Sequence, residues 1–355
     1  MADKESTVSD GVGDILLFVL QWLALLGIVA ALVAAGLALL GRAREAGGDR
    51  HRQLRIEVLN DRYRSRRQRL GLARLAPGER KRSIKAWRRE EKQRRKHGEA
   101  ALQGTVWVIE FHGDIKASAT PRLAEEISAL LAVAEEGDEV VVLLESAGGL
   151  VHAYGLAAAQ LDRLRDAGIA TTVCVDKVAA SGGYMMACTA QRLRVAPFAV
   201  LGSIGVVAQL PNVHRLLKRH DIDVDVMTAG RYKRTLTVFG ENTEEGREKF
   251  IEDLEGIHSL FKAYVSERRP QLDIEAVATG EIWYGSEAPD KGLADEVGTS
   301  EAYLLDRMAE ARVLKVSLET RKGLSERIGL AASHGIERGV ERTLEALDAS
   351  RWLRR

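Results

Sequence analysis

The sequence has only two cysteines among its 355 residues, Cys174 and Cys188, so it cannot contain a disulfide framework. Both lie in apolar surroundings, which is typical of buried and unreactive thiols. No H-x-x-x-H or C-x-x-C spacing occurs, so we predict no metal site. The dinucleotide fingerprint and the phosphate-binding loop are also missing, and we therefore expect no cofactor. The G-x-S-x-G nucleophile motif is absent as well, because position 179 is alanine.

Charge is nearly balanced over the whole chain, at +1, but it is distributed unevenly. Residues 15–41 contain no charged side chain, and this length can span a bilayer. The preceding residues 1–14 are acidic, whereas a cleaved signal peptide begins with basic residues and has a shorter apolar core. We therefore expect an acidic tail at 1–14 and a retained transmembrane helix at 15–41.

The segment 42–98 is polybasic, with 21 lysine and arginine residues against 7 acidic residues. Pro77-Gly78 interrupts it, which predicts a linker of two helices. Its only aromatic residues are Tyr63 and Trp87, which is sparse for a nucleic-acid site, so we favour anionic membrane lipid as its partner and expect no nucleic acid. Basic residues directly after a span favour the cytoplasmic side, which predicts an inner-membrane protein with a cytoplasmic catalytic domain.

From residue 99 to 315 the pattern is that of an α/β domain with mainly parallel strands. The expected strands cover 105–111, 139–145, 169–175, 192–195 and 224–227. The expected helices start at Thr120 and cover 152–165, 243–268 and 274–279. Residues 316–355 are predicted to form a C-terminal helical tail, because apolar residues recur every four positions within 325–347.

The stretch DKVAASGGY, residues 176–184, contains the strongest candidate for chemistry. It places Ser181 where a strand is followed by a helix, with the Gly182 amide at the helix N-terminus. Such an amide has no helical partner and favours a developing oxyanion, while the serine hydroxyl can act as a nucleophile. A glycine-rich turn with a serine helix cap would have the same sequence.

Other glycine-containing turns follow strands at 111–114 and 146–149, and in an open α/β sheet such turns gather at one edge. His112 and His152 lie near these turns, but each fits a local hydrogen-bonding role better than a catalytic one. A serine can instead use a lysine base. A lysine has an ordinary pKa of about 10.4, so such a base must be shielded from water. Lys177 and Lys233 are the candidates, and a solvated position is the simpler interpretation of each.

Five stretches of the chain resemble the signal peptide peptidase A family of membrane serine proteases. They are 144–149, 175–184, 201–206, 230–233 and 241–247, in the family's order. The resemblance extends over about residues 105–300. It departs from the family at Ala147, where the family often has proline.

The resemblance implies a Clp-protease/crotonase fold, built from β-β-α units, and assembly into ring- or dome-shaped homo-oligomers. It also implies a serine–lysine dyad. The implied roles are nucleophile for Ser181, general base for Lys233, orientation of that lysine for Ser203, and oxyanion-binding amides for Gly149 and Gly182.

The leading hypothesis is thus a membrane-anchored serine endopeptidase that cleaves signal-peptide remnants or other membrane-associated or unfolded peptides. A crotonase-type acyl-CoA enzyme would share the fold but leave Ser181 and Lys233 idle. A non-catalytic membrane scaffold would depend mainly on the polybasic segment. The family is usually described as facing the compartment outside the cytoplasm, in conflict with the charge rule applied above.

Overall fold

The computed structural model describes residues 52–97 and 104–320. The chain divides into two compact units, one from Leu54 to Leu318 and the other comprising both chain ends. The predicted acidic tail, the transmembrane helix at 15–41 and the helical stretch at 325–347 lie outside the described residues. None of the helices in 52–97 and 104–320 is both long and apolar enough to cross a membrane.

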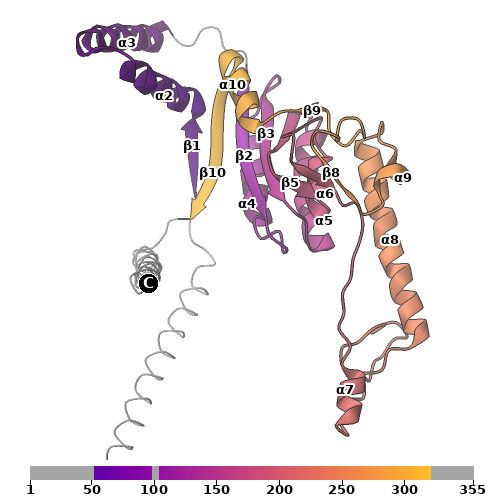
Figure 1. Cartoon of the computed structure of the whole chain (residues 1–355). Coiled ribbons are helices and arrows are strands. Elements are labelled where there is room, and N and C mark those ends of the chain that lie inside the picture. The colour runs from indigo at the N-terminus through magenta and orange to yellow at the C-terminus, as the bar shows by residue number, and fades with distance from the viewer. Residues whose placement is uncertain (1–51, 98–103, 321–355) are drawn as a thin grey trace, which may run out of the picture. The chain divides into compact units, whose positions relative to one another are not determined.

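The first unit has a mixed α/β fold around a ten-stranded sheet (Figure 1). The strands follow the order β1-β10-β2-β3-β4-β6-β9, and β5 branches from β3 to pair with β7, which in turn pairs with β8. The strands are β1 (Arg52–Val58), β2 (Thr105–Gly113), β3 (Glu139–Ser146), β4 (Ala170–Val175), β5 (Val178–Ala180), β6 (Arg192–Val195), β7 (Val200–Gly202), β8 (Ile282–Tyr284), β9 (Glu296–Val297) and β10 (Arg312–Thr320). The pairings from β10 to β9 are parallel, and β7 pairs with β8 antiparallel.

Helices connect most of the parallel strands, as the alternating sequence pattern predicts. The labelled helices are α2 (Leu59–Ala73), α3 (Pro77–His97), α4 (Thr120–Leu131), α5 (Val151–Asp166), α6 (Gly182–Ala187), α7 (His214–Arg219), α8 (Glu244–Arg268), α9 (Ile274–Val277) and α10 (Ser300–Glu310). Four of the five predicted strands are confirmed. The fifth, at 224–227, was wrong, because this stretch forms no strand and most of its side chains are exposed.

The polybasic segment forms the two predicted helices, α2 and α3, with α3 beginning at Pro77. It differs from the prediction at its start, where Arg52–Val58 forms strand β1 beside β10. Strand β10 in turn continues through the expected domain boundary at residue 315 and pairs with β2. Tertiary pairing with distant strands decides both assignments, and local charge gives no sign of it.

The central strands are buried on both faces, as their nearly continuous apolar sequences predict. On β3, Val140 and Val142 pack into one apolar cluster with helices α4 and α5, while Val141 packs into a second cluster with α10. The two cysteines are buried among these residues, and burial raises the pKa of each thiol to about 12. Both are therefore protonated packing groups, as expected.

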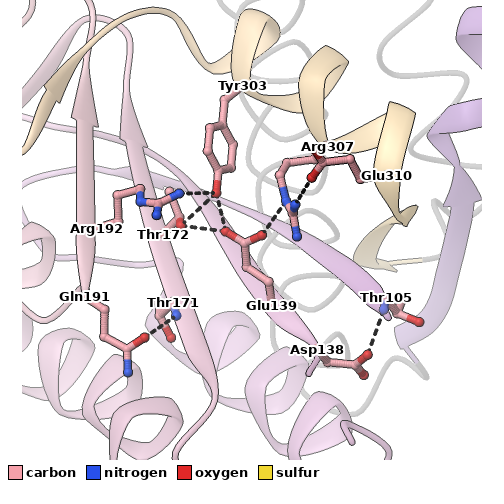
Figure 2. Close-up of polar contacts among 10 residues, drawn as sticks. All are labelled: Thr105, Asp138, Glu139, Thr171, Thr172, Gln191, Arg192, Tyr303, Arg307 and Glu310. Carbon is pink, nitrogen blue, oxygen red and sulfur yellow. Dashed lines mark hydrogen bonds and ion pairs between the residues drawn. The ribbon is translucent and has the colours of Figure 1, made fainter. Parts of the chain in front are cut away.

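A polar cluster fixes α10 against the amino-terminal ends of the strands (Figure 2). The carboxylate of Glu139, at the start of β3, accepts hydrogen bonds from Thr172 Oγ1 at 2.6 Å, from Arg307 Nε at 2.8 Å and from the Tyr303 hydroxyl. Arg192 Nη1 approaches the same tyrosine oxygen at 3.4 Å. Burial, together with the bond to Glu139, raises the pKa of Tyr303 to about 12, so its hydroxyl remains a donor.

Glu139→Ala should lower the free energy of unfolding by about 3 kcal/mol, because it leaves two hydroxyls and a guanidinium partly buried without their acceptor. Glu310→Ala is the matched control, since Glu310 pairs with the same Arg307 at 2.7 Å but is exposed. It should cost less than about 1 kcal/mol. Urea unfolding of both variants measures the difference, and equal losses would contradict the role given to Glu139.

Candidate active site

Three turns meet at the carboxyl ends of β2, β3 and β5, as the sequence predicts. Gly113 pairs in register with Ser146, and Ser146 pairs with Ala179. The turns also touch directly, because the amide of Leu150 donates to the carbonyl of Ile115 at 2.8 Å. The polar cluster around Glu139 lies at the opposite ends of the same strands. The fold therefore separates the candidate active site from the contacts that fix α10.

Ser181 lies between the end of β5 and the start of α6. A strand-to-helix position was predicted, but the strand before it is the short β5 and not the expected strand at 169–175. Its backbone has φ 52° and ψ −122°, a combination that non-glycine residues rarely adopt. Such a conformation costs of order 1–3 kcal/mol and is found mainly at functional sites. The backbone is fixed on both sides, since the Ser181 amide donates to Gly202 O at 2.8 Å and its carbonyl accepts from Met185 N at 3.0 Å.

The turn at 147–149 lies against the serine turn. Gly148 has φ 89°, and a Cβ there would be 2.8 Å from both Ser181 Cβ and Gly182 N. A Cβ at Gly149 would lie 2.1 Å from Ile115 O, so neither position has room for a side chain. Within the described residues, the backbone amides of Gly149 and Gly182 have no hydrogen-bond acceptor. These two amides are therefore available to bind an anion beside Ser181.

Ser203 follows β7 as Ser181 follows β5, and the two strands pair with Ala180 opposite Gly202. The structure thus brings Ser203 next to Ser181 along the sheet edge. Ser203 also has a positive φ, of 50°, and its amide donates to Glu281 O at 2.6 Å. Its side chain is half-buried.

Lys233 lies on a long exposed segment between β7 and α8, which includes α7. Figure 1 shows α7 near the start of α8 and away from the sheet. The amide of Lys233 closes a turn with Gly230 O at 3.1 Å, and the neighbouring Arg231 pairs with Glu245 at 2.8 Å. Across the described residues, no hydrogen bond joins the Lys233 side chain to Ser181 or Ser203. The lysine–serine pairing therefore remains a prediction.

The other candidate bases point to solvent. Lys177 is exposed and pairs with Glu145 at 3.0 Å, and His112 Nδ1 lies 3.7 Å from the same carboxylate. His152 is exposed at the start of α5. The described part of the chain also contains no group of three or more side chains suited to a metal ion.

Sequence reasoning missed two buried side chains beneath the turns. Tyr154 was not singled out, and Ser146 was treated only as part of a turn, although their hydroxyls lie 2.6 Å apart. A lone aromatic residue in an alanine-rich helix that directly follows a Gly-Gly turn is the signal that could have identified Tyr154.

Comparison with known proteins places these features in a family. Residues 10–161 match the family model "Peptidase family S49 N-terminal", and residues 163–315 match "Peptidase family S49". The probable protease SohB of Haemophilus influenzae is 59% identical over 227 residues, which cover 64% of each chain. A probable protease SohB of Buchnera aphidicola subsp. Schizaphis graminum is 45% identical, over 74% of this chain and 78% of the relative.

Among solved structures, a membrane-bound stomatin-specific protease, 1510-N, is similar at 13% identity with a TM-score of 0.40. That match covers 61% of this chain and all of the other. The family models confirm the predicted family, and the relatives show that the chain is similar to the SohB proteases in particular. The chain belongs to peptidase family S49.

Proposed function

We propose that this protein is a membrane-anchored serine endopeptidase that works through an acyl-enzyme intermediate. The observation that carries the proposal is the strained Ser181, held at a strand-to-helix junction beside two amides that have no acceptor among residues 52–97 and 104–320. A hydroxyl nucleophile next to oxyanion-binding amides is the arrangement that acyl transfer requires. Family S49 membership and relatives described as probable proteases support the same chemistry.

In the proposed mechanism, Ser181 Oγ attacks the peptide carbonyl carbon and its proton passes to the Lys233 amine. The amides of Gly149 and Gly182 bind the resulting oxyanion. Collapse of this intermediate breaks the C–N bond, and Lys233 returns the proton to the leaving amine. Water then attacks the acyl-enzyme by the same route and regenerates Ser181. Ser203 orients the lysine.

Assembly into a homo-oligomer belongs to this proposal, because a lysine base has to be shielded from water. In the single chain the Lys233 segment is open to solvent, and Val207 and Met227 within it are each 91% exposed. Further large apolar residues are exposed there, namely Leu210, Leu216, Ile222, Val226, Tyr232 and Phe239. Apolar surface on this scale favours coverage by a partner, and a second copy of the chain is the partner we propose.

Membrane lipid is the other proposed partner. Helices α2, α3 and α10 line a cleft of about 1080 Å³. Its wall includes Arg66, Arg67 and Arg74 together with Glu90 and Glu91. The guanidinium groups of Arg62 and Arg66 lie 5.6 and 5.5 Å from the centre of the Tyr63 ring. Leu70 is 71% exposed. Arginines and exposed apolar groups directly after a charge-free stretch suit an anionic membrane surface. Basic residues directly after a membrane span favour the cytoplasmic side, so in this proposal the catalytic domain lies on the cytoplasmic side of the inner membrane.

The proposed substrates are peptides at or near the membrane, such as signal-peptide remnants or unfolded segments. A crotonase-type acyl-CoA enzyme is the main alternative. Labelling by a serine-directed phosphonate at Ser181 separates the two, since the acyl-CoA alternative leaves that serine idle.

Ser181→Ala and Lys233→Ala should each reduce peptide hydrolysis by at least about a thousandfold, because a nucleophile and its base act as one unit. Lys177→Ala is the matched control, since it removes an exposed lysine near the same turn and should leave hydrolysis unchanged. Turnover of a fluorogenic peptide measures all three. Activity that survives in Lys233→Ala but not in Lys177→Ala would show that the wrong base has been chosen.

Ser203→Ala should reduce turnover by roughly tenfold to a hundredfold, because the serine orients a reacting group without reacting itself. The loss should depend on pH, since orientation of the base affects its proton transfer. A pH–rate profile from neutral to mildly acidic conditions checks this, and a profile that superimposes on the wild-type curve would refute the role.

Deletion of Met1 to Gly41 should release the protein from membranes in high salt while the catalytic domain stays folded. In low salt the truncated protein should still bind vesicles that contain anionic lipid, through the basic helices, but not neutral vesicles. Vesicle sedimentation measures both effects. Retention on membranes in high salt would mean that another segment inserts.

A further inference from the structure

Two buried hydroxyl groups, those of Ser146 and Tyr154, lie beneath the three turns of the candidate active site. Ser146 is the last residue of β3 and Tyr154 lies in the first turn of α5, and neither is more than 1% exposed. We propose that they are positioning residues that hold the Gly149 and Gly182 amides in place to bind the oxyanion. This inference rests on the proposed serine mechanism and adds residues that do not themselves react.

The hydrogen bonds around the two hydroxyls have a fixed direction. Tyr154 donates its only proton to the carbonyl of Asp114 at 2.8 Å. The Ser146 hydroxyl, 2.6 Å from the tyrosine oxygen, must therefore donate to it. The serine oxygen is then free to accept from the Gly148 amide, at 3.1 Å. Burial raises the pKa of Tyr154, so the tyrosine keeps its proton at neutral pH.

The resulting chain runs from the Gly148 amide through Ser146 and Tyr154 to the Asp114 carbonyl. It joins the turn that contains Gly149 to the turn that follows β2. Because each of the two hydroxyls both accepts and donates, the bonds of this series reinforce one another. This series of hydrogen bonds fixes the orientation of the Gly148 peptide group and, through it, that of the next peptide group.

The ring of Tyr154 supports the third turn by contact. A Cβ on Gly182 would lie 2.4 Å from Tyr154 Cγ, and a Cβ on Gly183 would lie 2.3 Å from Ser146 O. The serine turn thus rests directly on the same two residues. The ring of Tyr154 therefore fixes the position of the Gly182 amide. Its hydroxyl fixes the orientation of the peptide groups of residues 148 and 149.

Position matters here because the amides act on charge that develops only in the transition state. An error of about 1 Å at such a site can cost a hundredfold in rate. Loss of the tyrosine hydroxyl alone should leave the ring under Gly182 while it frees Ser146 and the Gly148 peptide to turn. The loss of the hydroxyl should thus lower the rate of catalysis and leave ground-state binding of the substrate nearly unchanged.

The test compares Tyr154→Phe and Ser146→Ala with Tyr184→Phe in the full chain. Tyr184 is the matched control, since it is also buried and its hydroxyl donates to a carbonyl, Leu293 O at 3.0 Å, but it contacts no turn of the site through that group. Thermal unfolding shows whether Tyr154→Phe and Tyr184→Phe lose similar stability.

With a fluorogenic peptide, Tyr154→Phe and Ser146→Ala should each lower kcat by roughly tenfold to a hundredfold and change KM less than about twofold. Labelling by a peptidyl phosphonate, whose tetrahedral oxygen occupies the oxyanion site, should slow in proportion. The double variant should be no slower than the slower single variant, because each substitution breaks the same series of hydrogen bonds. Tyr184→Phe should keep wild-type kcat.

The outcomes distinguish this inference from the proposed function. If wild type is inert to both peptide and phosphonate, the serine mechanism itself fails. If wild type reacts and Tyr154→Phe matches it in kcat and labelling rate, the mechanism stands and the positioning role is wrong. Equal kcat losses in Tyr154→Phe and Tyr184→Phe, or multiplicative losses in the double variant, would also overturn the positioning role.

Discussion

The contact between Gly148 and Ser181 is the constraint on which the rest of the site depends. Ala180 O, Gly182 N and Ser181 Cβ would all lie 2.8 Å from a Cβ at position 148. The two turns can approach this closely only because residue 148 has no side chain and adopts a positive φ. The approach places the Gly149 and Gly182 amides beside one serine. The strained backbone of Ser181 persists because its neighbours on both sides hold it.

The parallel sheet explains why the candidate active site and the polar cluster around Glu139 lie at opposite ends of the strands. Carboxyl ends of parallel strands gather at one edge, and there the chain makes its glycine-rich turns. At the amino-terminal ends, the Glu139 carboxylate accepts hydrogen bonds from Thr172, Tyr303 and Arg307 (Figure 2). These bonds fix α10 to the sheet. Substitutions at one edge can therefore alter activity with little effect on the contacts at the other.

The two halves of the proposed dyad differ in how the fold holds them. Ser181 is fixed by strand pairing, helix α6 and three turns, whereas Lys233 lies on a segment with many exposed apolar side chains. The proposed nucleophile and the two amides proposed to bind the oxyanion are thus held in place in the single chain. Shielding of the proposed base requires an additional surface, which is the physical reason for coupling the proposed activity to assembly.

Local patterns in the sequence determined the α/β class, four of the central strands, the break between two helices near Pro77 and the serine turn, because burial on both faces and turn chemistry act over a few residues. They also indicated the family, through motifs around Ser181 and Gly149. The false strand at 224–227 shows the limit of this reasoning, since an apolar stretch becomes a strand only when another strand pairs with it.

Only the tertiary structure decided the contacts between residues far apart in the chain. It joined Tyr154 to Asp114 across 40 positions and placed Ser203 beside Ser181 through β5 and β7. It also drew β1 and β10 into the sheet against the local expectation. These contacts depend on which segments pack together in the complete sheet. No single stretch of the chain determines that packing.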